Sequence, residues 1–216
     1  MKKSPAFDLF NPAPEQVTGP GQVQTSIVRT VDITGMTYHK DFITKEEESK
    51  LIDQILSEEW LGDLKRRVQH YGWKYDYKAR SLDYSMYLGS LPQWISVFSK
   101  RLVEHGMMTE EPDQVIINEY KPGQGIANHV DCEPCFGDTI ISLSLSSACT
   151  MNFINLSSQE KKEVVLLPRS VVVIKGDARY HWSHGIPARL ADQIDGTRIN
   201  RKLRISMTFR KVISRD

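Results

Sequence analysis

The sequence has 216 residues, of which 40% are hydrophobic and 25% are charged, and its formal net charge at pH 7 is +1. A chain of this length and composition can bury one substantial core, so we expect a single folded domain. The balance of 28 basic and 27 acidic residues excludes a strongly basic coat protein for nucleic acid, so any contact with nucleic acid must depend on local clusters of charge.

The sequence shows no feature of a membrane or secreted protein. It has no run of 18 or more apolar residues, and its N-terminus lacks the apolar stretch of a signal peptide. Three cysteines are an odd number and do not predict a disulfide framework, which fits a reducing compartment. We therefore expect a cytoplasmic protein with no membrane partner and no evident obligate protein partner.

The N-terminal segment differs from the rest of the chain. Residues 1–30 hold four of the ten prolines and show no sustained hydrophobic period, so we expect an extended or disordered tail there and a folded domain over residues 31–216. Thr44 and Glu47 have the spacing of a capping box, and apolar residues at helical spacing follow them. This pattern predicts a helix from about Lys45 to Glu59.

A second helix is predicted to begin near Pro92, which is favourable in a first turn. Its apolar stripe consists of Trp94, Ile95, Phe98 and Leu102. From Gln114 onward the hydrophobic period shortens to that of strands. Six strands are expected, over Val115–Tyr120, Thr139–Leu145, Thr150–Ile154, Val164–Leu167, Ser170–Ile174 and Leu203–Phe209. Helices followed by short strands predict an α+β, mainly β domain built as an antiparallel sandwich or barrel.

A histidine and an aspartate follow a glycine-rich turn in the middle of the chain. If that segment is extended, His129 and Asp131 project from the same side of it because strand side chains alternate. His184 is the best candidate for a third ligand. Two imidazoles and one carboxylate form the facial triad of non-haem Fe(II) oxygenases, although such a pair also occurs by chance as ordinary polar residues.

The C-terminal strand places two arginines on one polar face. Arg204 and Arg210 alternate with apolar residues, so they share a side of the strand. This pattern fits a solvated edge strand, and it also fits a clamp for the distal carboxylate of 2-oxoglutarate, because guanidinium binds carboxylate with two parallel hydrogen bonds. Asn118 and Tyr120 share a face of another predicted strand and could donate hydrogen bonds to the same molecule.

Four motifs in this order resemble the AlkB family of Fe(II)/2-oxoglutarate dioxygenases. The resemblance covers roughly residues 32–212 and rests on Asn118-Glu119-Tyr120-Lys121-Pro122-Gly123, His129-Val130-Asp131, His184-Gly185-Ile186 and the pair Arg204 and Arg210. It implies a double-stranded β-helix, or jelly roll, with N-terminal helices and a substrate lid. It also implies Fe(II) as cofactor and 2-oxoglutarate and O₂ as cosubstrates.

The resemblance assigns a role to each matching residue. His129, Asp131 and His184 would ligate iron and form the catalytic centre. Asn118 and Tyr120 would hold the cosubstrate, Arg204 would pair with its distal carboxylate, and Arg210 would line the pocket. The roles of these seven residues follow from the family and not from their spacing.

A basic and aromatic segment precedes the second helix. Residues 61–80 carry six basic and two acidic side chains, and four aromatic residues alternate within them: Tyr71, Trp73, Tyr75 and Tyr77. A strand here would be aromatic on one face, which is typical of a half-buried strand and also of a lid that stacks an extruded base. In the second interpretation Arg66 and its neighbours contact the substrate.

Three residues after the metal motif leave alternatives open. Glu133 is either a contact to the target base, at a place where related repair enzymes carry an aspartate, or a solvated loop residue. Cys132 and Cys135 lack a second cysteine pair, so a zinc site is disfavoured, and we interpret them as small loop residues open to oxidation.

The first expectation for function is oxidative demethylation of N-alkylated bases in DNA or RNA, as single strands or flipped bases, with release of formaldehyde, succinate and CO₂. It rests on the likeness of a stand-alone domain to bacterial repair members. The alternative is hydroxylation of a modified wobble uridine in tRNA, because Arg66-Arg67-Val68 and Arg179-Tyr180 are similar to that eukaryotic branch. A non-catalytic nucleic-acid-binding module on the same fold is the second alternative.

Overall fold

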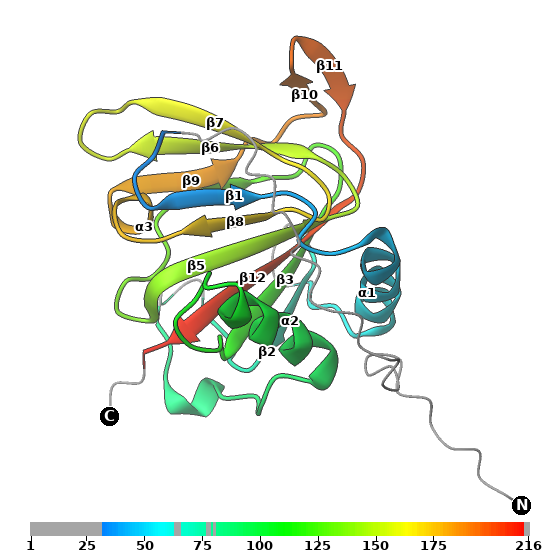
Figure 1. The fold of residues 1–216 in the computed structure, drawn as a ribbon, viewed down its shortest axis with the longest axis vertical. Coiled ribbons are helices and arrows are strands. Elements are labelled where there is room, and N and C mark those ends of the chain that lie inside the picture. Colours follow the sequence, from blue (N-terminus) through cyan, green and yellow to red (C-terminus); the bar gives the residue numbers. More distant parts are fainter. Residues whose placement is uncertain (1–31, 63–65, 77–78, 80, 214–216) are drawn as a thin grey trace, which may run out of the picture.

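Two antiparallel sheets form the body of the protein (Figure 1). The structure is a computed structural model that describes residues 32–62, 66–76, 79 and 81–213. In this part of the chain the larger sheet has the strand order β1 (Met36–His39), β8 (Val171–Ile174), β5 (Phe136–Leu145), β12 (Arg204–Val212), β3 (Gln114–Tyr120) and β2 (Val68–Tyr71). The smaller sheet has the order β4 (Ile126–His129), β9 (Trp182–Ile186), β6 (Cys149–Asn155) and β7 (Lys161–Leu166).

This arrangement confirms the predicted jelly roll. The six expected strands are present. Three of them extend three residues further than the hydrophobic pattern indicated, β5 and β7 at the N-terminal end and β12 at the C-terminal end. Strands β1, β9, β10 and β11 were not predicted as strands. Each has only four or five residues, which is too short for a period of two to stand out from the surrounding sequence.

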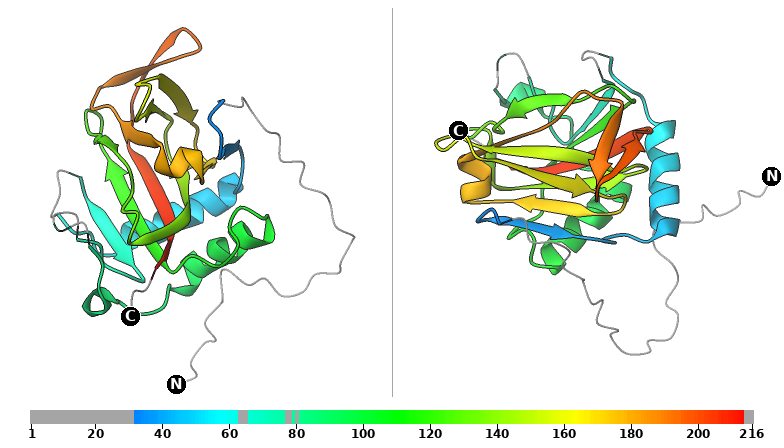
Figure 2. Two further views of the ribbon diagram at one scale, coloured as in Figure 1. Left: turned by 90° about the vertical axis from the view of Figure 1, so that its left-hand side faces the viewer. Right: turned by 90° about the horizontal axis from the view of Figure 1, so that it is seen from above.

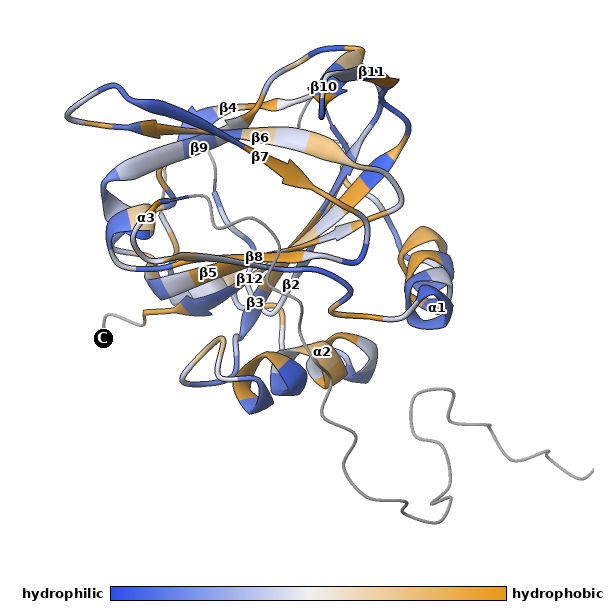
Figure 3. Cartoon of the chain, turned by 45° about the horizontal axis from the view of Figure 1, so that its top comes forward, coloured by the Kyte–Doolittle hydropathy of each residue, from blue (hydrophilic) through white to orange (hydrophobic). Residues whose placement is uncertain are grey.

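Two helices cover the outer face of the larger sheet (Figures 1 and 2). Helix α1 (Lys45–Ser57) ends two residues before the predicted limit and begins with the predicted capping box, in which Thr44 Oγ1 accepts from Glu47 N at 3.1 Å. Helix α2 (Gln93–Glu104) follows Pro92, and its predicted apolar stripe is buried. Figure 3 shows hydrophilic and hydrophobic residues beside one another on both helices, as expected for elements with one buried face.

The alternation of side chains along β12 divides the interior into two compartments. Ile205, Met207 and Phe209 pack in one hydrophobic cluster with the buried residues of α1 and α2. Arg204 and Arg210, which flank these three residues and belong to the alternate set, line a cavity between the two sheets. Both faces of this strand are therefore covered, so its polar side is not a solvated edge.

Three small elements complete the fold. Helix α3 (Asp177–Tyr180) precedes β9, a 3₁₀ turn spans Tyr84–Met86, and β10 (Ala191–Ile194) pairs with β11 (Thr197–Asn200) in a hairpin that projects at the top of Figure 1. The base of the hairpin is fixed by Arg201, whose Nε lies 2.6 Å from a carboxylate oxygen of the buried Asp192. No helix among the described residues is long and apolar enough to span a membrane.

The covering helix α1 allows a matched test of the core. Leu51 is 0% exposed and Leu56 is 47% exposed on the same helix. We expect Leu51→Ala to lower the free energy of unfolding by about 2–5 kcal/mol because it leaves a cavity, and Leu56→Ala to lower it by less than about 0.5 kcal/mol. Urea unfolding followed by circular dichroism measures both, and equal losses would contradict the packing of α1 on the sheet.

Candidate metal and cosubstrate site

A cavity of about 300 Å³ lies between the two sheets. The larger sheet contributes Asn118 and Tyr120 from β3 and four polar residues of β12. The smaller sheet contributes His129 at the end of β4 and His184 on β9. With Arg66 also in its wall, the cavity brings together side chains that are separated by up to 144 positions in the sequence, counted from Arg66 to Arg210.

Three potential metal ligands converge at one end of this cavity. His129 and His184 are direct partners in the pairing of β4 with β9, and their ring centroids lie 4.6 Å apart. Asp131 follows β4, and its Oδ2 lies 3.4 Å from His184 Nε2. One ligand atom from each of the three residues lies within 4.8 Å of the others. The sequence predicted this convergence, and the structure shows it.

The charge state of each group suits a divalent cation. Burial, followed by the nearby His184, lowers the pKa of His129 to about 4, so this imidazole is neutral at pH 7. Its Nδ1 lies 2.8 Å from the carbonyl oxygen of Ala127 and is positioned to donate to it, which leaves Nε2 available. Burial opposes ionisation of Asp131, but Arg210, His184 and His129 hold its pKa well below the ordinary value.

The two carboxylate oxygens of Asp131 differ in their hydrogen bonding. Arg210 donates to Oδ1 through Nε at 2.9 Å and lies 2.6 Å away through Nη2. Oδ2 is buried without a hydrogen-bond partner, and so is His184 Nδ1. A buried anion oxygen normally has a partner. The donor set and this orphaned oxygen therefore fit a bound Fe(II).

Arg204 lines the same cavity as the three potential metal ligands. It is 2% exposed, donates through Nη2 to Ser144 Oγ at 2.8 Å, and lies 5.4 Å from the centroid of the Tyr120 ring. Its Nε and Nη1 are buried and have no hydrogen-bond partner. Two unsatisfied donors on a buried cation fit a carboxylate ligand.

Arg66 contributes a further positive charge to the cavity wall. It lies on a loop before β2, donates through Nε to Asn118 Oδ1 at 2.8 Å, and lies 5.7 Å from the centre of the Tyr120 ring. No acidic side chain among the described residues forms an ion pair with it. The expectation that Arg66 faces the substrate is compatible with this placement and remains a prediction.

The aromatic segment does not form the single alternating strand that was predicted. Strand β2 ends at Tyr71, because Gly72 has φ +76°, a backbone conformation outside the strand region. Tyr71 packs edge-to-face on Trp94 of α2, with ring centroids 5.3 Å apart, on the outer side of the sheet. It was wrongly placed in the lid, and its role is in the core.

The other aromatic residues of the segment have separate environments. Trp73 packs with Tyr84 and Tyr87, which are exposed to solvent, and does not line the cavity. Tyr75 lines the cavity and packs against Phe136. Tyr77 lies outside the described residues. Of the described aromatic residues of this segment, Tyr75 is thus the one in a position to contact a base beside the metal group.

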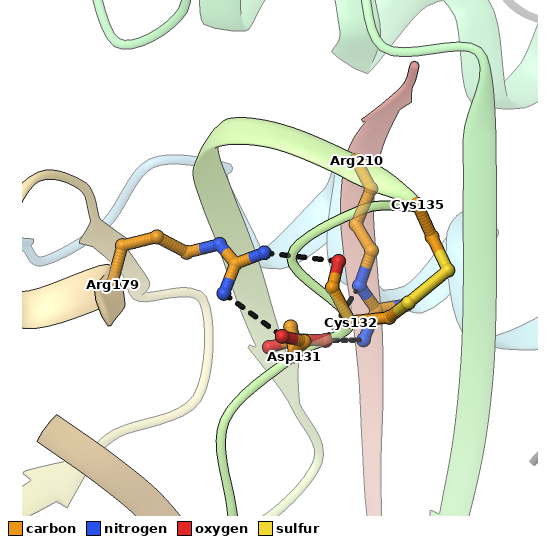
Figure 4. Close-up of a disulfide and its surroundings, with 5 residues drawn as sticks. All are labelled: Asp131, Cys132, Cys135, Arg179 and Arg210. Atoms are coloured by element: carbon orange, nitrogen blue, oxygen red, sulfur yellow. Dashed lines mark hydrogen bonds and ion pairs between the residues drawn. A yellow bond between two sulfur atoms is a disulfide. The ribbon is translucent and has the colours of Figure 1, made fainter. Parts of the chain in front are cut away.

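The loop after Asp131 also differs from expectation. Strand β4 ends at His129, and the backbone N–H groups of Cys135 and Phe136 both donate to the Cys132 carbonyl, so the alternation that placed Glu133 on the metal side does not continue. Glu133 is exposed and does not line the cavity. Cys132 and Cys135, which were interpreted as loop residues open to oxidation, are joined in a disulfide (Figure 4). A single bridge in a tight turn gives no framework signal in the sequence.

Two residues at the site were not predicted. Ser144 holds Arg204, and its inward direction follows from the period of β5, so the pattern of that strand could have identified it. Arg179 is buried beside Asp131 and contacts two backbone carbonyl oxygens. No side-chain pattern in a sequence indicates a partner that belongs to the backbone.

Comparison with known proteins identifies the family. Residues 35–210 match the family model of the 2OG-Fe(II) oxygenase superfamily. The chain belongs to this superfamily. Fe(II), 2-oxoglutarate and O₂ are therefore its cofactor and cosubstrates, and the chain is a dioxygenase of the AlkB family.

The relatives include a protein of similar length and a much longer one. This oxygenase is 38% identical over 186 residues to the uncharacterized protein L905 of Acanthamoeba polyphaga mimivirus, covering 86% of this chain and 88% of that protein. It is 36% identical over 202 residues to the mouse tRNA (carboxymethyluridine(34)-5-O)-methyltransferase ALKBH8, covering 82% of this chain but 30% of the relative. The solved structure of OsALKBH1 shares the fold with a TM-score of 0.62 and 18% identity, covering 85% of this chain and 99% of that one.

The pairing of β4 with β9 allows a test of how the histidines are placed. A Cβ atom at Gly185 would lie 2.8 Å from the backbone nitrogen of Asn128 and from the carbonyl oxygen of Ile126. This distance is shorter than a van der Waals contact, so an alanine fits only if one of the two strands moves. We expect Gly185→Ala to separate β9 from β4, lower the free energy of unfolding by about 1–3 kcal/mol, and weaken metal binding by moving His184.

Thermal unfolding and anaerobic titration with Co(II), an oxygen-stable probe, measure the two effects. Ser183→Ala on the same strand is the control, because it removes a hydroxyl that donates to the Ile154 carbonyl and adds no atom toward β4. Unchanged Co(II) affinity in a folded Gly185→Ala variant would contradict this account of the histidine pair.

Proposed function

We propose that this oxygenase hydroxylates an alkyl carbon carried by a base of a nucleic acid. The observation that supports the proposal is the pair of unsatisfied buried groups on two sides of one cavity, Asp131 Oδ2 and the Arg204 guanidinium. His129, Asp131 and His184 would hold Fe(II), and Arg204 would hold the distal carboxylate of 2-oxoglutarate. Together with O₂, the bound iron and cosubstrate supply an oxidant that inserts oxygen into a C–H bond.

The protein's own side chains orient the reactants. Arg66 donates to Asn118, and the guanidinium carbons of Arg66 and Arg204 lie 5.7 and 5.4 Å from the centroid of the Tyr120 ring, so Asn118 and Tyr120 are both held in place to contact the cosubstrate. Arg210 lines the cavity and keeps Asp131 ionised and directed toward the histidines. Tyr75 on the wall of the cavity is the candidate for stacking on the target base.

The charges on the wall bear on which base fits. Among the described residues that line the cavity, Asp131 is the one carboxylate, and it is paired with Arg210. Glu133, the other acidic candidate, is exposed. Arg66 adds a positive charge without an acidic partner in the described chain. A cationic N-methylated base in this cavity would be buried without a counter-charge, which costs free energy. A neutral base would not have this electrostatic cost.

These charges favour a substituted uridine in RNA over the N-alkylated base that the sequence placed first. The name of the mouse relative, which refers to carboxymethyluridine 34 of tRNA, supports the same choice. Hydroxylation of such a substituent leaves the oxygen on the base, while hydroxylation of an N-methyl group ends in loss of formaldehyde. Oxidative demethylation of DNA or RNA remains the second candidate, and membership in an oxygenase family removes the non-catalytic alternative.

The role of Arg204 can be tested by cosubstrate binding. We expect Arg204→Met to raise the Kd for 2-oxoglutarate by about 10- to 100-fold, because a hydrogen-bonded charged pair contributes about 1.5–3 kcal/mol. Arg204→Lys should fall between this variant and wild type, since it keeps the charge and loses the planar fork. Anaerobic titration of the Fe(II) protein, followed by the charge-transfer band, gives the Kd.

Arg198→Met on the exposed strand β11 is the control for loss of one positive charge. A wild-type Kd in Arg204→Met would mean that another group binds the distal carboxylate.

The substrate class can be tested by running methylated oligonucleotides and tRNA in parallel under ¹⁸O₂. We expect ¹⁸O in a uridine nucleoside of the tRNA digest, and no release of formaldehyde from oligonucleotides with cationic N-methyl bases. Mass spectrometry of the nucleosides and a formaldehyde assay provide the measurement. Asp131→Ala serves as the inactive control. Formaldehyde release with no oxygen in any uridine would instead favour demethylation.

A further inference from the structure

Arg179 is a buried cation that belongs to none of the roles described above. It lies at the end of α3, is 2% exposed, and points toward the loop after β4 (Figure 4). Its Nη1 donates to the Asp131 carbonyl at 3.0 Å, and its Nη2 donates to the Cys132 carbonyl at 3.2 Å. Its Nε is buried without a hydrogen-bond partner. The side chain thus uses both terminal nitrogens on the backbone of the segment that carries the carboxylate.

Stability alone gives no clear reason for a cation at this position. Arg179 is held almost completely away from water, and burial of its positive charge costs free energy. No ion pair with a described acidic side chain compensates this cost; the nearest charges act on it at a distance. An apolar side chain of similar volume is often equally stable or more stable at such a site.

The contacts of the loop show what the arginine constrains. Arg210 fixes the side chain of Asp131 from the larger sheet, whereas Arg179 fixes its backbone from the opposite side (Figure 4). The Cys132 carbonyl also accepts from Cys135 N and Phe136 N, so the turn closes directly behind the carboxylate. With both its side chain and its backbone held, Asp131 has little freedom to turn Oδ2 away from His184.

We propose that Arg179 is a positioning residue for the metal site, which holds the backbone of Asp131 so that Oδ2 faces the two histidines. The inference rests on the proposed iron ligands. It adds that metal affinity depends on a guanidinium that touches neither the metal nor the substrate. Groups that orient metal ligands typically change metal affinity about 10- to 100-fold when they are lost.

The test separates positioning from folding by measuring metal affinity and thermal stability of the same proteins. We expect Arg179→Met to weaken anaerobic Co(II) binding by about 10- to 100-fold, and Arg179→Lys, which keeps the charge and one donor direction, to weaken it less. Arg169→Met is the matched control, because Arg169 is a partly buried arginine paired with Glu48 and Asp41 away from the cavity. It should lower the melting temperature and leave the Co(II) affinity unchanged.

Two results would overturn the proposal. The first is wild-type Co(II) affinity in folded Arg179→Met, whatever its melting temperature; if that variant does not fold, wild-type affinity in Arg179→Lys has the same meaning. The second is a loss of affinity in Cys135→Ser with none in the Arg179 variants, which would make the disulfide the element that holds the loop. A wild-type protein that binds no Co(II) would instead contradict the proposed metal site itself.

Discussion

Asp131 lies in the loop that follows β4 of the smaller sheet, Arg210 lies on β12 of the larger sheet, and their ion pair connects the two halves of the site. Both histidines belong to the smaller sheet, whereas Arg204, Asn118 and Tyr120 belong to the larger one. The distance between the metal group and the cosubstrate clamp therefore depends on how the sheets are registered against each other. A short, nearly buried ion pair is well suited to fix this register, because its energy falls steeply when either partner moves.

The two buried arginines of the cavity differ in whether an anion of the protein pairs with them. Arg210 is neutralised by Asp131, but Arg204 is buried with two donors that nothing in the described chain accepts. In a medium of low dielectric constant such a cation is costly until a carboxylate pairs with it. If Arg204 binds 2-oxoglutarate as proposed, the cosubstrate would complete the electrostatic balance of the folded site, and a cationic base would add to the charge that the site has to compensate.

The sequence predicted those parts of the site that depend on strand periodicity. The alternation in residues 203–210 separated arginines from core residues, because β12 pairs with β3 and β5 on its two sides without a shift of register up to Arg210. The same rule gave a wrong prediction for the aromatic segment, because Gly72, with its positive φ, ends the strand. Tyr71 and Tyr75 therefore lie on different sides of the sheet. The role of Arg179 could not be predicted from the sequence, because its partners are backbone carbonyl oxygens that only the folded loop brings into position.

A strand with a polar face can remain in the interior only if its other face contributes enough apolar burial. On β12 that contribution comes from Ile205, Met207 and Phe209, which are all 0% exposed beneath α1 and α2. The two helices therefore support the site without lining it, because they stabilise the strand that holds Arg204 and Arg210 away from water. Because the polar residues and the core residues of this strand share one backbone, a change in the packing of the helices would shift both arginines together, and with them the register on which the metal group depends.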